Sequence, residues 1–260
     1  HASRDYDRAV DLDPGLPSSY IARGNFRSPI GRAREALADF DHALQLYPAS
    51  AEAYSGRAYL YLQQGNLKAA VSAFDKALTY DANASYVLGG RASAYQIAGN
   101  HDAALHDYSE AVRLDPSEPF IKLLLLVEEA RAGKTDQAKK DFAAFAADTR
   151  FDEWPRAIAR FLAGEISVAD IESIANQGSE SDKQAHAFDR DFYLGQAALV
   201  AGNAADAQRR LQAVVDTGDR QYIEYNIAAA DVAKLKSGSA VSGTTTNPSG
   251  EASNDLTPAN

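Results

Sequence analysis

The residues best suited to metal chemistry lie in the segment HDAALHD, residues 101–107. It holds two histidines, His101 and His106, and each is followed by an aspartate. Metal ligands on a helix share one face when they are four residues apart, whereas these histidines are five apart. We therefore expect this segment to form a solvated helix face rather than a metal site.

Other patterns that would carry catalysis are missing from the sequence. The chain has no cysteine, which excludes thiol nucleophiles, zinc–thiolate sites and disulfides. It contains no GxSxG motif, no HExxH motif and no glycine-rich loop that would hold phosphates. An activity has to be argued from a site, so we predict that the chain is not an enzyme and uses no cofactor.

The composition narrows the class of partner. The net charge is −10 over 260 residues, which disfavours nucleic acid and anionic membrane surfaces, because both attract basic proteins. No run of about 18 apolar residues occurs, so we expect no transmembrane segment. A hydrophobic content of 45% is enough for a continuous core. A protein or peptide partner is the class that remains.

The dominant feature of the sequence is an internal repeat with a period of 34 residues. A glycine, a small residue five positions later and an aromatic residue four positions further return without an insertion. The glycines are Gly31, Gly65, Gly99 and Gly133; the small residues are Ala36, Ala70, Ala104 and Ala138; the aromatic residues are Phe40, Phe74, Tyr108 and Phe142. A fixed period of this length predicts a solenoid of supersecondary units.

These marks resemble the tetratricopeptide repeat, a helix–turn–helix unit, over residues 2–145. The resemblance implies an all-α fold, a right-handed superhelix of stacked helix pairs, and a role as a non-catalytic scaffold or adaptor. Small residues would let neighbouring helices approach closely, and aromatic residues would fill the space that remains. The glycine would end the first helix of each unit in a left-handed conformation.

We predict three parts in the chain. Residues 1–148 form the repeat array, in which a truncated first repeat precedes four full ones. Residues 149–236 form a helical extension with a divergent repeat and a final helix that caps the stack. Residues 237–260, rich in Ser, Gly, Thr and Asn, are expected to be a disordered tail. Because the first repeat lacks its first helix, we expect that the natural chain continues upstream.

The first full repeat departs from the pattern. Pro29 stands near the end of its first helix and should end that helix early, because proline lacks the backbone donor. A distorted edge repeat and a rim reshaped for a partner are both compatible with this change.

The extension shows a second, narrower resemblance. Its segments EWP, FLAGEIS and FYLGQAALVAG are similar to those of bacterial outer-membrane tetratricopeptide lipoproteins, which serve as adaptors for envelope proteases and cell-wall hydrolases. This favours the periplasm or cell envelope over the cytoplasm, although no lipobox cysteine is present. The matching residues are Trp154, Pro155, Gly164, Tyr193, Gly195, Gly202, Glu224 and Tyr225.

The family resemblance also supplies a candidate binding site. It implies that the first helices of the repeats line a concave groove. No repeat carries lysine at its fifth position, so we do not expect the carboxylate clamp of chaperone-binding members. A partner peptide or helix would lie on an aromatic and aliphatic floor. The predicted groove residues are Ile21, Asn25, Tyr59, Leu62, Gln63, Tyr86, Ser93, Ile97 and Phe120.

Several alternatives stay open at this point. The groove is either a ligand site or a surface covered by the chain's own C-terminal helices or by a second subunit, because an apolar face indicates an interface without saying whose. The chain is either a free-standing adaptor, the repeat portion of a larger multidomain hydrolase, or a homodimeric structural protein of the envelope.

Overall fold

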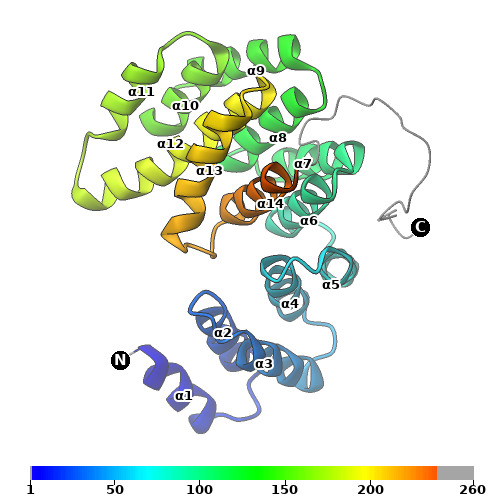
Figure 1. Cartoon of the computed structure of the whole chain (residues 1–260). Helices are drawn as coiled ribbons and strands as arrows, with labels where there is room; N and C mark the ends of the chain where they lie inside the picture. Colours follow the sequence, from blue (N-terminus) through cyan, green and yellow to red (C-terminus); the bar gives the residue numbers. More distant parts are fainter. Residues whose placement is uncertain (1, 239–260) are drawn as a thin grey trace.

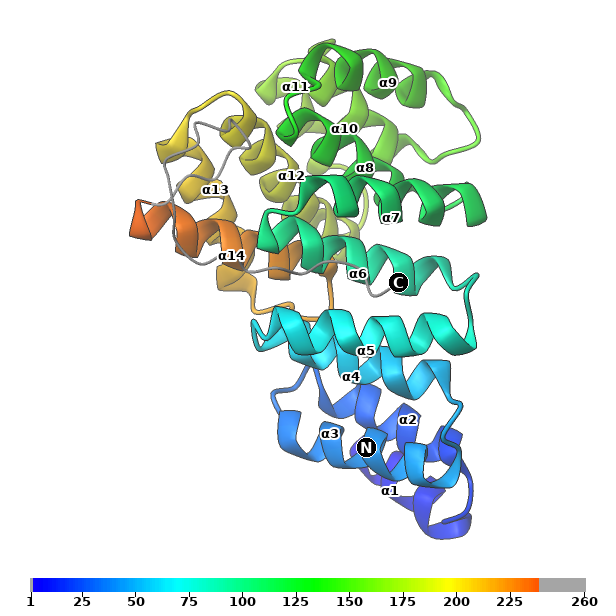
Figure 2. The ribbon, with the colours of Figure 1, turned by 90° about the vertical axis from the view of Figure 1, so that its right-hand side faces the viewer.

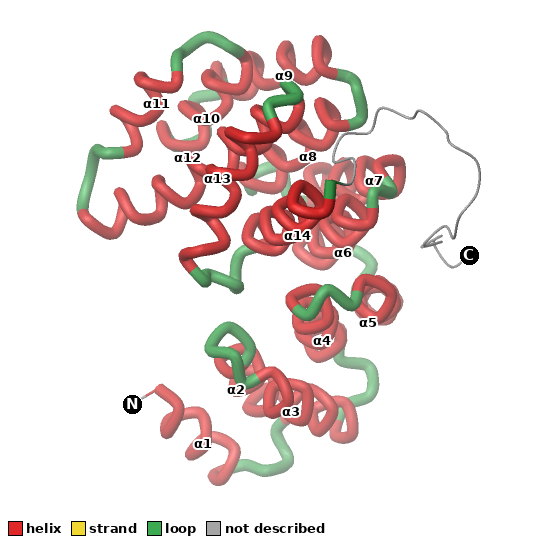
Figure 3. The backbone as a smooth tube through the Cα atoms, in the orientation of Figure 1, coloured by secondary structure: helices red, strands yellow, loops and turns green. Residues whose placement is uncertain are grey.

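The computed structural model describes residues 2–238, which form α-helices joined by short loops (Figures 1 and 3). This range contains fourteen helices and no strand, so the all-α prediction is confirmed. The predicted tail lies outside the described residues from residue 239 onward. The right-handed twist of the array stays a prediction.

Helices recur along the array with the period of the sequence. The first helices of successive repeats begin 34 residues apart, and so do the second helices. Figure 2 shows these helices stacked in successive rows. The bounds are α1 Ala2–Leu12, α2 Pro17–Arg27, α3 Ala33–Leu46, α4 Ala51–Gln63, α5 Leu67–Tyr80, α6 Ser85–Ala98, α7 His101–Leu114, α8 Pro119–Arg131 and α9 Thr135–Ala147.

The repeating glycines are required for their backbone conformation. Gly31, Gly65, Gly99 and Gly133 have φ values of 80°, 72°, 80° and 86°, which confirms the predicted left-handed turn. A Cβ atom at any of these positions would meet no atom within 4 Å. Strain in φ, rather than crowding, therefore keeps larger residues out of these turns.

The repeating aromatic residues fill the space between neighbouring repeats. Phe40 is fully buried, and its ring would lie 2.8 Å from a Cβ added at Gly24 and 2.5 Å from one at Gly56. One ring thus occupies the gap between the first helices of two repeats, which glycine alone leaves open. In the first full repeat, α2 ends at Arg27, before Pro29, as its proline predicts.

After the array, the chain folds back onto it. The remaining helices are α10 Glu153–Ala163, α11 Val168–Ala175, α12 Glu180–Val200, α13 Ala204–Thr217 and α14 Ile223–Ser237. Ser167 and Asp170 form a capping box at the start of α11, and Gly164 ends α10 with φ 84°. Helix α13 packs on α12 and α14, and α14 also contacts α6 (Figures 1 and 2).

Helix α14 packs on α13, the helix before it, and also lies beside α6 of the array. Its role as the cap of the stack stays a prediction. Lys234 Nζ donates a hydrogen bond of 2.8 Å to the carbonyl oxygen of Ile97 in α6. Arg131 of α8 forms an ion pair of 2.7 Å with Asp231 of α14, and both side chains are buried. These polar contacts hold the last helix against the concave side of the repeats.

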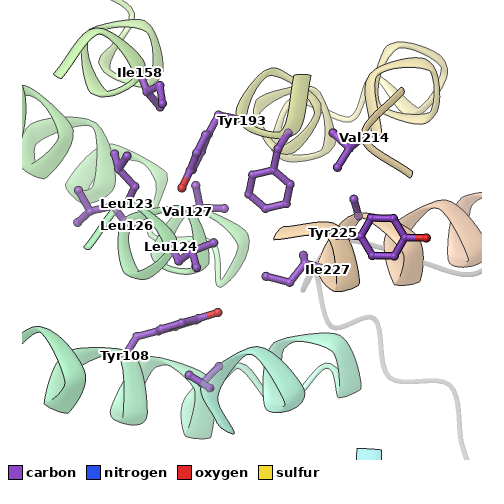
Figure 4. Close-up of a cluster of buried hydrophobic side chains, with 14 of the residues drawn as sticks. Tyr108, Leu123, Leu124, Leu126, Val127, Ile158, Tyr193, Val214, Tyr225 and Ile227 are labelled. Atoms are coloured by element: carbon purple, nitrogen blue, oxygen red, sulfur yellow. The ribbon is translucent and has the colours of Figure 1, made fainter. Parts of the chain in front are cut away.

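Apolar packing joins the extension to the array as well. Figure 4 shows Tyr108 of α7, Leu124 of α8, Tyr193 of α12 and Ile227 of α14 converging on one cluster. All four side chains are at most 1% exposed. A smaller cluster unites helices α1 to α4 at the N-terminal end. The extension and the later repeats therefore share a single core.

Candidate functional site

The structure separates the predicted groove residues into buried and accessible ones. Ile21, Leu62 and Ser93 are at most 7% exposed. Ile21 belongs to the N-terminal core, and the Ser93 hydroxyl donates to the carbonyl of Gly90 in its own helix. These three side chains are parts of the fold, so we do not retain them as partner-binding residues.

Helix α14 occupies the groove at α6. Ile97 is partly buried in the main core, and its carbonyl oxygen accepts the hydrogen bond from Lys234. Here the chain's own C-terminal helix covers this part of α6, the arrangement that one of the open alternatives describes. Gln63 is also engaged: its Nε2 donates a hydrogen bond of 3.0 Å to the carbonyl of Arg220, and its Oε1 accepts one from Ser28.

Beside this covered stretch, the structure leaves a cavity of about 760 Å³. Tyr59, Tyr86 and Phe120, three of the predicted groove residues, line it from α4, α6 and α8. Its opposite walls come from α10, α12 and the start of α14. We call it the interface cavity. Asn25 lies apart from it, exposed beside a second hollow of about 610 Å³ next to the loop before α14.

Aromatic rings from distant parts of the chain form the walls of the interface cavity. Trp154 stacks on His186 with ring centroids 4.2 Å apart, and Phe188 packs on Tyr222 at 5.2 Å. On the array side, the Tyr59 hydroxyl donates a hydrogen bond of 2.6 Å to the carbonyl of Tyr86. Burial raises the pKa of Tyr59, which keeps this donor protonated.

Two carboxylates of the interface cavity lie in apolar surroundings. Glu224, in the first turn of α14, is 8% exposed, and burial raises its pKa to about 7, with further contributions from Asp189 and Glu118. Burial also raises the pKa of Asp189 to about 6, although the hydrogen bond from Trp154 favours its ionised form. Both groups therefore change charge near neutral pH.

The groove prediction missed the half of the cavity that the extension supplies. His186, Phe188, Asp189 and Tyr222 were not singled out, because nothing in their local sequence says which face of α12 meets the repeats. Trp154 and Glu224 were noticed only through the lipoprotein resemblance. One usable signal was the placement of aspartates between aromatic residues in FDRDFY, residues 188–193, which is unusual for a solvated face.

Among residues 2–238, no group of three or more His, Cys, Asp or Glu side chains is arranged to hold a metal ion. None of the described helices combines the length and the apolar character that a membrane span requires.

Comparison with known proteins identifies the repeats. Two sequence models of the tetratricopeptide repeat family match residues 31–94 and 86–118. Residues 31–118 are thus similar to tetratricopeptide repeats. Proteins with such repeats generally mediate protein–protein interactions and are typically non-catalytic scaffolds. No curated protein sequence matches the chain significantly.

Solved tetratricopeptide structures share the fold. A tetratricopeptide repeat protein from Parabacteroides merdae ATCC 43184 has a TM-score of 0.58 at 18% identity, and the match covers 88% of this chain and 91% of that one. Pseudomonas aeruginosa pilF has a TM-score of 0.51 at 18% identity, with 80% of this chain and 96% of that one covered. At these identities the likeness concerns the fold alone.

Proposed function

We propose that the protein is a non-catalytic adaptor that binds a segment of a partner protein in the interface cavity. The observation that carries this proposal is the convergence of aromatic side chains on one hollow between the repeats and the extension, with Tyr86 and Tyr222 exposed there. Aromatic residues provide large apolar contact area at low entropic cost, and tyrosine adds a polar tip, so they are enriched at binding hot spots.

The size and position of the cavity support a peptide segment as ligand. A volume of about 760 Å³ holds a few side chains rather than a whole helix. The groove at α6 is closed by α14, so the partner would enter beside α14 and not lie along the full concave face. This narrows the predicted ligand, a partner peptide or helix in the groove, to a short anchored segment.

The location in the bacterial periplasm or cell envelope belongs to the same proposal. Its support is the resemblance of the extension to envelope lipoprotein adaptors, and Trp154 and Glu224, which carry that resemblance, both line the cavity. The segments that carry this resemblance thus also supply walls of the interface cavity.

The proposal is tested by selecting ligands and removing one wall of the cavity. Random short peptides displayed on phage are enriched on the immobilised protein, and the affinity of the enriched peptide is measured by calorimetry. Tyr86 is 45% exposed, so Tyr86→Ala removes a cavity wall without opening the core. We expect it to weaken binding about tenfold, the usual effect of losing an aromatic anchor.

The matched control is Tyr47→Ala, since Tyr47 is 54% exposed and lies on the array away from the cavity. Its affinity should equal that of the unmodified protein. Failure to enrich any peptide, or equal losses for both variants, would overturn the proposal. Light scattering on the same samples reports whether the chain is a homodimer and whether the peptide changes that state.

A further inference from the structure

We infer that the interface cavity recognises a basic side chain, lysine or arginine, presented by the partner segment. This inference rests on the proposed function and specifies what the cavity selects. Three observations support it: an unpartnered buried carboxylate, the charges that line the cavity, and the arrangement of the aromatic rings.

The carboxyl group of Glu224 lies at the wall of the interface cavity, and the residue as a whole is 8% exposed. Within residues 2–238 no other side chain gives it a hydrogen bond or an ion pair; its own backbone N–H is the donor it has. Buried carboxylates are normally paired, because an unpaired buried charge is costly. A cation from outside the chain would supply the missing partner.

The lining of the interface cavity is negatively charged. No lysine or arginine side chain lines it among the described residues, and His186 is its one titratable nitrogen. The carboxylates that line it are Asp115, Glu118, Asp189, Asp219 and Glu224. Glu224 and Asp189 come from α14 and α12, so two separate elements present negative charge to the same space. The lining is complementary to a positive ligand group.

The surroundings of these carboxylates suit an organic cation better than a metal ion. The described carboxylates do not gather closely enough to hold a metal ion. Instead they stand among Trp154, Phe188 and Tyr222, whose rings favour contact with an organic cation. A lysine or arginine side chain fits both features, because its aliphatic stem packs on the rings while its charged end reaches the carboxylates. A free metal ion would contact the carboxylates but would not pack on the rings.

The test uses an intrinsic reporter. Trp154 is the chain's one tryptophan and lines the cavity, so its fluorescence responds to occupancy. The probes are acetylated and amidated pentapeptides with leucine on both sides of a central lysine, norleucine or glutamate. Norleucine keeps the aliphatic stem of lysine and lacks the ammonium group. We expect the lysine peptide to bind about tenfold more tightly than the norleucine peptide, and the glutamate peptide to bind weakest.

Variants assign the preference to the two carboxylates. Glu224→Gln and Asp189→Asn are close to isosteric, and circular dichroism checks that each remains folded. Each should reduce the preference for lysine over norleucine. Asp136→Asn, on the exposed face of α9, removes the same charge far from the cavity and should retain the full preference.

The outcomes separate the two proposals. Equal affinity for the lysine and norleucine peptides overturns the inference and leaves the peptide-binding function standing. No fluorescence change with any pentapeptide at millimolar concentration, while the phage-enriched peptide does change it, overturns the inference alone. No change with the phage-enriched peptide either overturns both. If n-butylamine alone binds as tightly as the lysine peptide, the cavity reads a free amine, and the inference of a partner's side chain is wrong.

Discussion

Trp154 Nε1 donates a hydrogen bond of 2.9 Å to Oδ2 of Asp189, and this bond ties α10 to α12 across the interface cavity. A face of the indole stacks on His186. A single side chain therefore holds the partly buried carboxylate in place and forms part of the aromatic wall. The same contact makes the extension sensitive to the charge of Asp189.

The variant Trp154→Phe keeps an aromatic ring and removes the donor. Since the pKa of Asp189 is about 6, its carboxylate is ionised at pH 8 and mostly protonated at pH 5. Losing a hydrogen bond to an ionised group should cost about 1–2 kcal/mol more at pH 8 than at pH 5. Urea denaturation followed by circular dichroism measures both values. An equal loss at the two pH values would mean that the hydrogen bond contributes nothing.

Glu224 should make the free protein less stable as pH rises. Its folded pKa of about 7 exceeds the ordinary value of 4.5, so between these values the native state keeps a proton that the unfolded chain has lost. The free energy of unfolding therefore falls with rising pH across this window. Glu224→Gln removes the titration and should gain about 1–3 kcal/mol relative to the unmodified protein between pH 4 and pH 8.

The control for this titration is Asp136→Asn, which removes one negative charge from an exposed position. It should show no comparable gain across this window. If Glu224→Gln behaves in the same way, the carboxylate of Glu224 is not held in an apolar environment and the cavity is differently built.

The ion pair between Arg131 and Asp231 should be the main polar tie between α8 and α14. Removing one partner of a buried pair typically costs about 3–5 kcal/mol, because the other charge stays in the core. Asp231→Asn keeps part of the hydrogen bonding, including that to Gln196, so we expect about 3 kcal/mol. The double variant Arg131→Met with Asp231→Leu should recover most of this loss in the same denaturation experiment; no recovery would contradict the assignment.

Ala104 tests the close approach of the repeat helices. It is fully buried at the repeating small-residue position, so Ala104→Phe should overpack the stack and lower the free energy of unfolding by about 1–3 kcal/mol. Ala144→Phe places the same ring on the exposed face of α9 and should change stability by about 0.5 kcal/mol or less. Equal melting temperatures for the Ala104→Phe variant and the unmodified protein would show that the repeat register is wrong.

The repeat array was predictable because its signals are local and recur. Each glycine with positive φ marks a turn, and each buried aromatic such as Phe74 marks the facing helix, so the period alone locates both helices of every repeat. Pro29 likewise predicted the early end of α2 from a single backbone property.

The return of α14 and the interface cavity were beyond the reach of such signals. Gln63 contacts Arg220 across 157 positions, and Arg131 contacts Asp231 across 100, and neither pair is marked by a motif. Leu62 and Ser93 looked like groove residues because the family places them on the inner helix. Which inner positions become core depends on how the extension packs, and that is decided by tertiary contacts.

The claim that a partner segment occupies the interface cavity is tested most directly by protection from alkylation. Because the chain has no cysteine, Tyr86→Cys and Tyr47→Cys each introduce a single reactive thiol. The rate of maleimide labelling is measured with and without a saturating amount of the phage-enriched peptide. We predict that the peptide slows labelling at position 86 in proportion to its occupancy and leaves position 47 unchanged. Unchanged labelling at position 86 by a peptide that is shown to be bound would contradict the account.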